Sequence, residues 1–131
     1  MLVVVDYGVG NQGSVLNMYR RLGIEAVRGA AAADIAAAGR LVLPGIGAFD
    51  HCMIRLRDAG LEAPLRAAIA RGVPLLGICV GMQMLLEGSE EGGQPGLGLI
   101  PGRAVRFATQ DAGLKVPHMG WNRVTQTQSH P

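Results

Sequence analysis

Short apolar runs alternate along the chain with longer segments of helical propensity, and this alternation limits the possible folds more than any other feature. The predicted strands are MLVVVDYG (1–8), IEAVRG (24–29), RLVLPG (40–45) and VPLLGIC (73–79). The predicted helices are 11–23, 31–39, 49–60, 61–72 and 80–88. Such alternation is typical of an open, mostly parallel sheet with helices on both faces and functional groups at the carboxyl ends of the strands. We therefore predict an α/β fold.

Composition excludes several other classes of protein. The chain has 131 residues, 49% of them hydrophobic and 17% charged, which fits a single globular domain over residues 1–131. Cys52 and Cys79 are too few for a disulfide framework or a metal cluster, and no secretory segment precedes the first strand, so we expect a cytoplasmic protein. The net charge of +2 gives no basic surface for nucleic acid, and no apolar run approaches the ~20 residues of a membrane span.

The first glycine-rich loop, GVGNQG from Gly8 to Gly13, has the spacing of a dinucleotide-binding fingerprint between a strand and a helix. An acidic residue that binds ribose is expected about 20 residues later, but the second strand offers only Arg28, which suits a 2′-phosphate. An NADP-binding module with contacts from Gly8, Gly10 and Arg28 therefore stays open as an alternative.

The loop GICVG, between the fourth predicted strand and the last predicted helix, has the form Gly-x-nucleophile-x-Gly. Gly77 and Gly81 would leave room for Cys79 on a sharp, strained strand-to-helix turn. The amino terminus of the following helix would lower the pKa of the thiol, and the Val80 N–H would stabilise an oxyanion. A cysteine that only fills space in the core is the alternative. The two flanking glycines favour a nucleophile.

The loop LPGIGAFD follows the third predicted strand and has Gly45 and Gly47 on either side of Ile46. A Pro-Gly pair alone indicates an ordinary turn. Beside the fourth strand, however, these glycines would let backbone N–H groups face a substrate and stabilise a developing negative charge.

Together, GICVGMQ and LPGIGAFD resemble the class I (triad) glutamine amidotransferases, which have a flavodoxin-like fold. The segments KVPHMGWN (115–122), DYGVGN (6–11) and GLGLIPG (96–102) are similar to the glutamine amidotransferase subunits of imidazole glycerol-phosphate synthase, an enzyme of histidine biosynthesis. The resemblance covers essentially the whole chain. It implies L-glutamine as substrate, no cofactor and no metal, and a heterodimer with a cyclase subunit that is a β/α barrel.

The resemblance also implies roles for individual residues. Cys79 would attack the side-chain amide of glutamine, and Val80 and the Ile46–Gly47 peptide would form the oxyanion hole. The released ammonia would pass to the cyclase, which makes imidazole glycerol phosphate and an aminoimidazole carboxamide ribotide. Residues implied to bind glutamine are Gly45, Gly47 and Gln83. Residues implied to face the cyclase are Asn11, Pro117, Met119, Trp121 and Asn122, although Met119 and Trp121 could instead be core residues.

The sequence departs from the family in its catalytic base. The family supplies a His-x-Glu pair near its carboxyl terminus, whereas His51, His118 and His130 are each followed by other residues. We predict a partly exposed helical position for His51 and place His118 in the interface segment. We therefore expect a C-terminally truncated chain that hydrolyses glutamine negligibly by itself and has an unpaired sheet edge. A non-catalytic subunit that docks on a cyclase stays open as a further alternative.

Overall fold

Four parallel strands form the central sheet of the computed structural model, which describes residues 1–108 and 115–129. The strands are β1 (Leu2–Val5), β2 (Ala26–Gly29), β3 (Arg40–Gly45) and β4 (Leu75–Cys79). They lie in the order β2-β1-β3-β4, and each neighbouring pair is parallel. The predicted α/β fold with a parallel sheet is confirmed.

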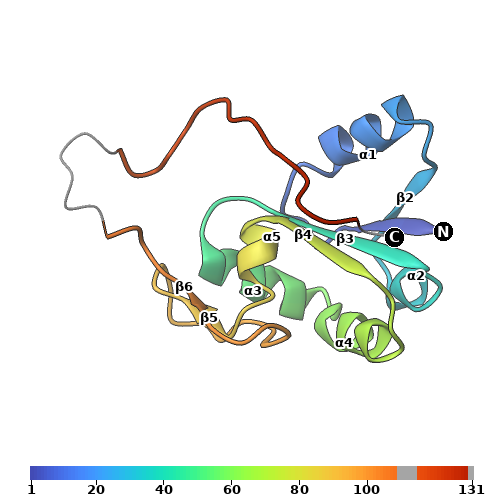
Figure 1. Cartoon of the computed structure of the whole chain (residues 1–131). Coiled ribbons are helices and arrows are strands. Elements are labelled where there is room, and N and C mark those ends of the chain that lie inside the picture. Colours follow the sequence, from blue (N-terminus) through green and yellow to red (C-terminus); the bar gives the residue numbers. More distant parts are fainter. Residues whose placement is uncertain (109–114, 130–131) are drawn as a thin grey trace.

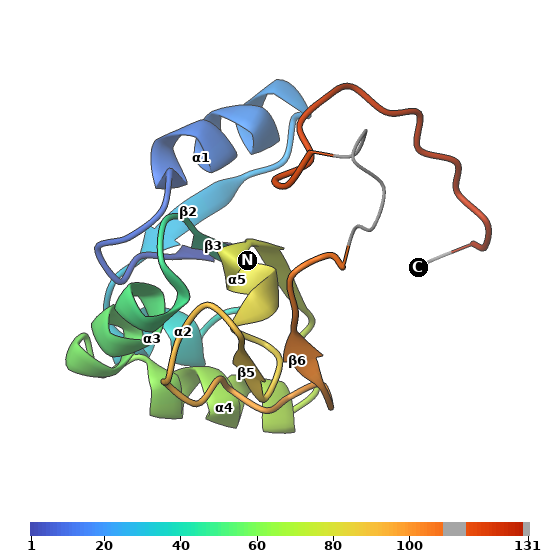
Figure 2. The same ribbon diagram turned by 90° about the vertical axis from the view of Figure 1, so that its left-hand side faces the viewer.

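Helices cover both faces of this sheet. Figure 2 shows α1 (Gln12–Arg21) on one side of the strands and α2 (Ala32–Ala36), α3 (Phe49–Asp58) and α4 (Glu62–Ala70) on the other side. Each helix follows a strand or another helix, as the alternating sequence pattern predicts. Because the four strands are parallel, their carboxyl ends share one edge of the sheet.

The core lies mainly between the sheet and the layer of α2, α3 and α4. The side chains of Val3 and Val5 in β1 are fully buried, as is Leu43 in β3. Phe49 and Leu56 of α3 belong to the same apolar cluster and are also fully buried. Burying one such side chain stabilises the fold by about 1.5–3 kcal/mol. Strands with continuous apolar runs are therefore most stable where both faces are covered, and β1 and β3 occupy the middle of the sheet.

The helix after β4 is shorter than predicted. The sequence favours a helix over 80–88, but α5 ends after Val80–Gln83. The Leu86 carbonyl accepts a hydrogen bond from the Gly98 N–H at 2.9 Å, and the Glu87 carbonyl accepts one from the Gly96 N–H at 2.9 Å. The following segment thus pairs with this part of the chain, and the helix does not continue.

The glycine-rich composition of segment 88–98 predicts a loose surface loop, but in the structure this segment is integrated into the fold. Gly88 and Ser89 form strand β5, which pairs with β6 (Arg103–Ala104), and Ser89 and Leu97 are buried. Figures 1 and 2 show β5 and β6 as a separate pair of strands, apart from the main sheet. The prediction of a loose loop is therefore wrong, because composition alone does not reveal the contacts that hold this segment.

The described residues 115–129 form neither helix nor strand and lie mostly at the surface (Figure 1). Within the described part of the chain, β4 pairs with β3 alone, and Leu76 of β4 is 53% exposed. No helix there combines the length and the apolar character that crossing a membrane requires.

Candidate active site

Cys79 lies at the junction between β4 and α5, with its thiol free and exposed. Its backbone angles are φ 57° and ψ −121°, in a region that side-chain-bearing residues rarely adopt. Holding a residue in this conformation costs about 1–3 kcal/mol, which the surrounding packing must offset. The geometry is that of a nucleophile presented at a strained strand-to-helix turn.

The glycines beside Cys79 allow α5 to pack directly on the sheet. A Cβ on Gly81 would overlap the carbonyl oxygen of Leu43 in β3. A Cβ on Gly77 would lie 2.6 Å from the Cα of Met82 in α5. These two glycines therefore permit a close approach of backbone to backbone, which sets where the turn at Cys79 stands.

The loop after β3 lies directly beside this turn. Gly45 and Cys79 are register partners in the β3–β4 pair, and a Cβ on Gly45 would come within 2.5 Å of the Gly81 nitrogen. Gly47 has φ +81°, and Ile46 between the two glycines is 59% exposed. The structure thus brings the two glycine loops together at one edge of the sheet. The roles of their N–H groups stay a prediction.

Two buried side chains bind the end of β3 and the loop that follows it. The Tyr7 hydroxyl donates a hydrogen bond to the Pro44 carbonyl at 2.7 Å and lies 3.6 Å from the Met84 sulfur. The Cys52 thiol donates to the Ile46 carbonyl at 3.3 Å. Burial raises the pKa of Tyr7 above its usual range, and the neighbouring Cys52 adds to this effect, so the hydroxyl stays a donor. No motif in the sequence indicates these contacts, and those of Tyr7 join residues 37 and 77 positions apart in the chain.

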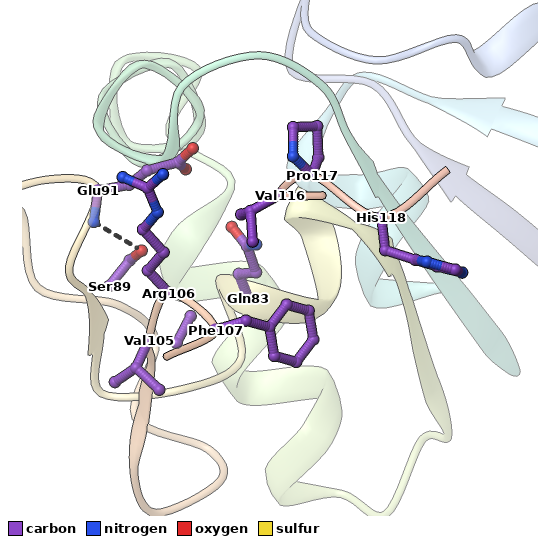
Figure 3. Close-up of a pocket in the computed structure, with 10 residues that line it drawn as sticks. Gln83, Ser89, Glu91, Val105, Arg106, Phe107, Val116, Pro117 and His118 are labelled. Carbon is purple, nitrogen blue, oxygen red and sulfur yellow. Dashed lines mark hydrogen bonds between the residues drawn. The ribbon is translucent and has the colours of Figure 1, made fainter. Parts of the chain in front are cut away.

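A pocket of about 710 Å³ lies next to Gln83, one helical turn beyond Cys79 (Figure 3). Oε1 of Gln83 is buried and has no hydrogen-bond partner among the described residues. A buried acceptor without a partner costs free energy, so a ligand that donates a hydrogen bond there would be favoured. The lining residues are Gln83, Ser89, Glu91, Ala104, Val105, Arg106, Phe107, Val116, Pro117 and His118.

Charged groups of both signs line this pocket. In Figure 3, Glu91 and Arg106 lie together on one side of Gln83, and His118 lies on the opposite side. The carboxylate of Glu91 suits an ammonium group, and the guanidinium of Arg106 suits a carboxylate. Sequence reasoning missed Glu91 and Arg106, because they belong to segments that carry no motif.

The residues of the NADP alternative have other partners in the structure. The guanidinium of Arg28, required to bind a 2′-phosphate, lies 3.4 Å from a carboxylate oxygen of Asp6. The Gly8 N–H donates to the other carboxylate oxygen of Asp6 at 3.0 Å. The side chain of Asn11 caps α1 by accepting the Ser14 N–H at 3.1 Å. The Gly8 N–H, the Asn11 side chain and the Arg28 guanidinium thus already have partners within the chain, which argues against a phosphate-binding site here.

The two histidines that the structure describes, His51 and His118, lie in different surroundings. His51 is exposed on α3, in line with its predicted position. His118 lines the pocket, and its Nε2 lies 2.9 Å from Nδ2 of Asn122. His130 lies outside the described residues. Met119 and Trp121, for which a core position was the alternative, are 86% and fully exposed.

Comparisons with known proteins point to one family. A family model described as class-I glutamine amidotransferase matches residues 3–130. The imidazole glycerol phosphate synthase subunit HisH of Salinibacter ruber is 48% identical over 136 residues, covering 100% of this chain and 62% of that protein. The subunit HisH 2 of Pseudomonas aeruginosa is 49% identical over 132 residues, covering 100% of this chain and 65% of that protein.

A solved structure described as a glutamine amidotransferase is also similar. Its TM-score is 0.67 at 26% sequence identity, covering 82% of this chain and 59% of the other chain. This chain thus spans about three fifths of the length of the proteins that it matches.

Proposed function

The chain belongs to the class-I glutamine amidotransferase family, and we propose that it is the glutamine-cleaving subunit of an imidazole glycerol phosphate synthase. In this role it takes ammonia from L-glutamine and delivers it to a cyclase subunit in histidine biosynthesis. The observation that carries the proposal is the exposed Cys79 at a turn with φ 57°. A cysteine that only fills core space has no need of that conformation.

The proposed chemistry begins with the sulfur of Cys79. Its thiolate adds to the carboxamide carbon of glutamine, and the N–H groups of Val80 and of the Ile46–Gly47 peptide stabilise the oxyanion. The C–N bond then breaks, ammonia leaves with an added proton, and water cleaves the γ-glutamyl thioester to glutamate. The departing nitrogen needs a proton donor. We therefore predict that these 131 residues alone turn glutamine over negligibly.

The pocket next to Gln83 provides for the rest of the substrate. We assign the α-ammonium group of glutamine to the Glu91 carboxylate and its α-carboxylate to the Arg106 guanidinium. Gln83 Oε1 accepts a hydrogen bond from the bound molecule, which satisfies its buried acceptor. Gly45 and Gly47, in the loop beside Cys79, are proposed to contact the bound glutamine as well.

A chloroketone built on the glutamine skeleton tests this assignment, because chloride leaves without a proton and only the attack by sulfur is measured. Labelling of Cys79 is expected to saturate with reagent concentration and to be slowed by L-glutamine. Glu91→Gln is expected to raise the half-saturating concentration about tenfold, as for the loss of a charged hydrogen bond. Mass spectrometry of the intact protein over time gives both quantities.

The matched control is Glu25→Gln, which removes one carboxylate between α1 and β2 and should leave the half-saturating concentration unchanged. Labelling that stays linear in reagent concentration and ignores L-glutamine would exclude a glutamine site. Equal half-saturation in the Glu91 variant and the wild type would exclude the proposed contact with the ammonium group.

We also propose that the exposed segment around Trp121 faces the cyclase subunit, together with Asn11, Pro117, Met119 and Asn122. Tryptophan is enriched among the hot spots of protein interfaces, and truncating a hot-spot side chain costs about 2 kcal/mol or more. Trp121→Ala is expected to weaken binding to the cyclase roughly 30-fold, measured by calorimetry. Val124→Ala, at a position that is 92% exposed and outside this set, serves as control. An unchanged dissociation constant for the Trp121 variant would remove this segment from the interface.

A further inference from the structure

The glycine-rich segment 88–95, called the pocket-wall loop below, is bound to helix α3 by a carboxylate. Oδ2 of Asp50 accepts a hydrogen bond from the Gly93 N–H at 2.9 Å, and its Oδ1 accepts one from the Gln94 N–H at 2.9 Å. A Cβ on Gly92 would overlap Oδ1 of Asp50. Three consecutive residues of the loop therefore lie directly against this side chain.

A second side chain of α3 binds the same loop. Nη1 of Arg57 donates to Oε1 of Gln94 at 2.7 Å, and Nη2 donates to the Pro95 carbonyl at 2.7 Å. The guanidinium is itself oriented by Glu62, whose Oε2 accepts from Nε at 2.9 Å. Asp50 and Arg57 are about two helical turns apart and so share one face of α3. Both ends of this helix face are thus used to hold the loop.

The opposite side of the pocket-wall loop is held by the segment around β6. The Glu90 N–H donates to the Ala104 carbonyl at 2.9 Å, and Oε2 of Glu90 accepts from the Arg106 N–H at 2.9 Å. Between the two attachments, the Glu91 N–H donates to Oγ of Ser89 at 3.1 Å, the hydrogen bond drawn in Figure 3. The residue that offers its carboxylate to the pocket therefore sits at the bend between two fixed points.

Helix α3 also begins only two residues after Gly47, at Phe49. Its first turn thus follows the loop that we assign to the oxyanion and, through Asp50, holds the loop that carries Glu91. Since Asp50 lies between two parts of the site without lining the pocket, its effect on a ligand would be indirect.

We propose that Asp50 is a positioning residue that sets the place of the Glu91 carboxylate and thereby the affinity for the α-ammonium end of the substrate. The inference rests on the proposed function, since it takes glutamine as the ligand. Asp50 does not touch the reacting atoms. Its loss should weaken binding and leave the rate of sulfur attack in the saturated complex unchanged.

Asp50→Asn separates these effects. The amide oxygen can still accept one N–H, but the amide NH₂ then faces the second N–H of the loop and repels it. Using the glutamine-derived chloroketone, we expect the half-saturating concentration to rise about fivefold, with the limiting labelling rate unchanged. This is less than the effect of Glu91→Gln, because Asp50 acts only through the position of the Glu91 carboxylate. The matched control is Asp58→Asn, which changes the last residue of the same helix and should alter neither quantity.

A double variant shows whether Asp50 acts through Glu91. Adding Asp50→Asn to Glu91→Gln should raise the half-saturating concentration little further, because the carboxylate being positioned is already gone. Fully additive effects would overturn the proposal. Gly92→Ala approaches the same contact from the loop side and should also raise half-saturation, which keeps the test decisive even if Asp50→Asn fails to fold.

The outcomes distinguish this inference from the proposed function. Saturable, glutamine-protected labelling of the wild type, with unchanged half-saturation in the Asp50 and Gly92 variants, would overturn the positioning role alone. Wild-type labelling without saturation or protection would overturn both.

Discussion

Cys79→Ser is expected to slow covalent labelling by the glutamine-derived chloroketone by roughly a thousandfold or more. A serine hydroxyl is a much weaker nucleophile than a thiolate, and Cys52, the other free cysteine of the described residues, is buried. Intact-mass measurement over time gives the rate. Peptide mapping of the wild type should place the label on Cys79 and leave the buried Cys52 unmodified.

The serine variant should keep the wild-type melting temperature, because the exchanged side chain is exposed and similar in size. Unchanged labelling of a folded Cys79→Ser protein would refute the nucleophile assignment. That result would instead support the alternative of a subunit that only docks on a cyclase.

Gly81→Ala is expected to have the largest effect on stability, with a loss of about 3 kcal/mol or more. The added methyl group would overlap the carbonyl oxygen of Leu43, which belongs to β3 in the interior of the sheet and cannot yield as a flexible side chain can. Thermal unfolding followed by circular dichroism should show a melting temperature at least about 10 °C lower, or no folded protein.

Gly13→Ala is the matched control for this substitution. Gly13 lies in α1, where an added Cβ meets only the Asn11 side chain at 4.0 Å, and alanine has the higher helix propensity. Its melting temperature should therefore equal or exceed that of the wild type. A Gly81→Ala protein that melts within about 2 °C of the wild type would contradict the close packing of α5 on β3.

The layout of the sheet was predictable because each strand is a local pattern. The run from Leu2 to Val5 is continuous and apolar, so it reads as a buried strand without knowledge of its neighbours. The turn at Cys79 was equally local, since its glycines adjoin it in sequence. By contrast, the end of α5 after Gln83 depends on pairing with residues 96–98, which no local propensity contains.

The pocket next to Gln83 was less predictable for the same physical reason. Gln83 follows Cys79 by one turn and belongs to the segment GICVGMQ. Glu91 belongs to a stretch rich in glycine and glutamate, whose composition is typical of a solvated loop. Its order comes from Asp50, more than forty residues earlier in the chain, through hydrogen bonds that a single sequence does not reveal.

Cys79 is the one non-glycine residue with positive φ in the described part of the chain. Glycine would adopt this backbone conformation with less strain, so selection for thermal stability alone would favour replacement of Cys79 by glycine. A stability-ranked library would accordingly enrich folded proteins that are chemically inert. The position marks where foldability and reactivity favour different amino acids.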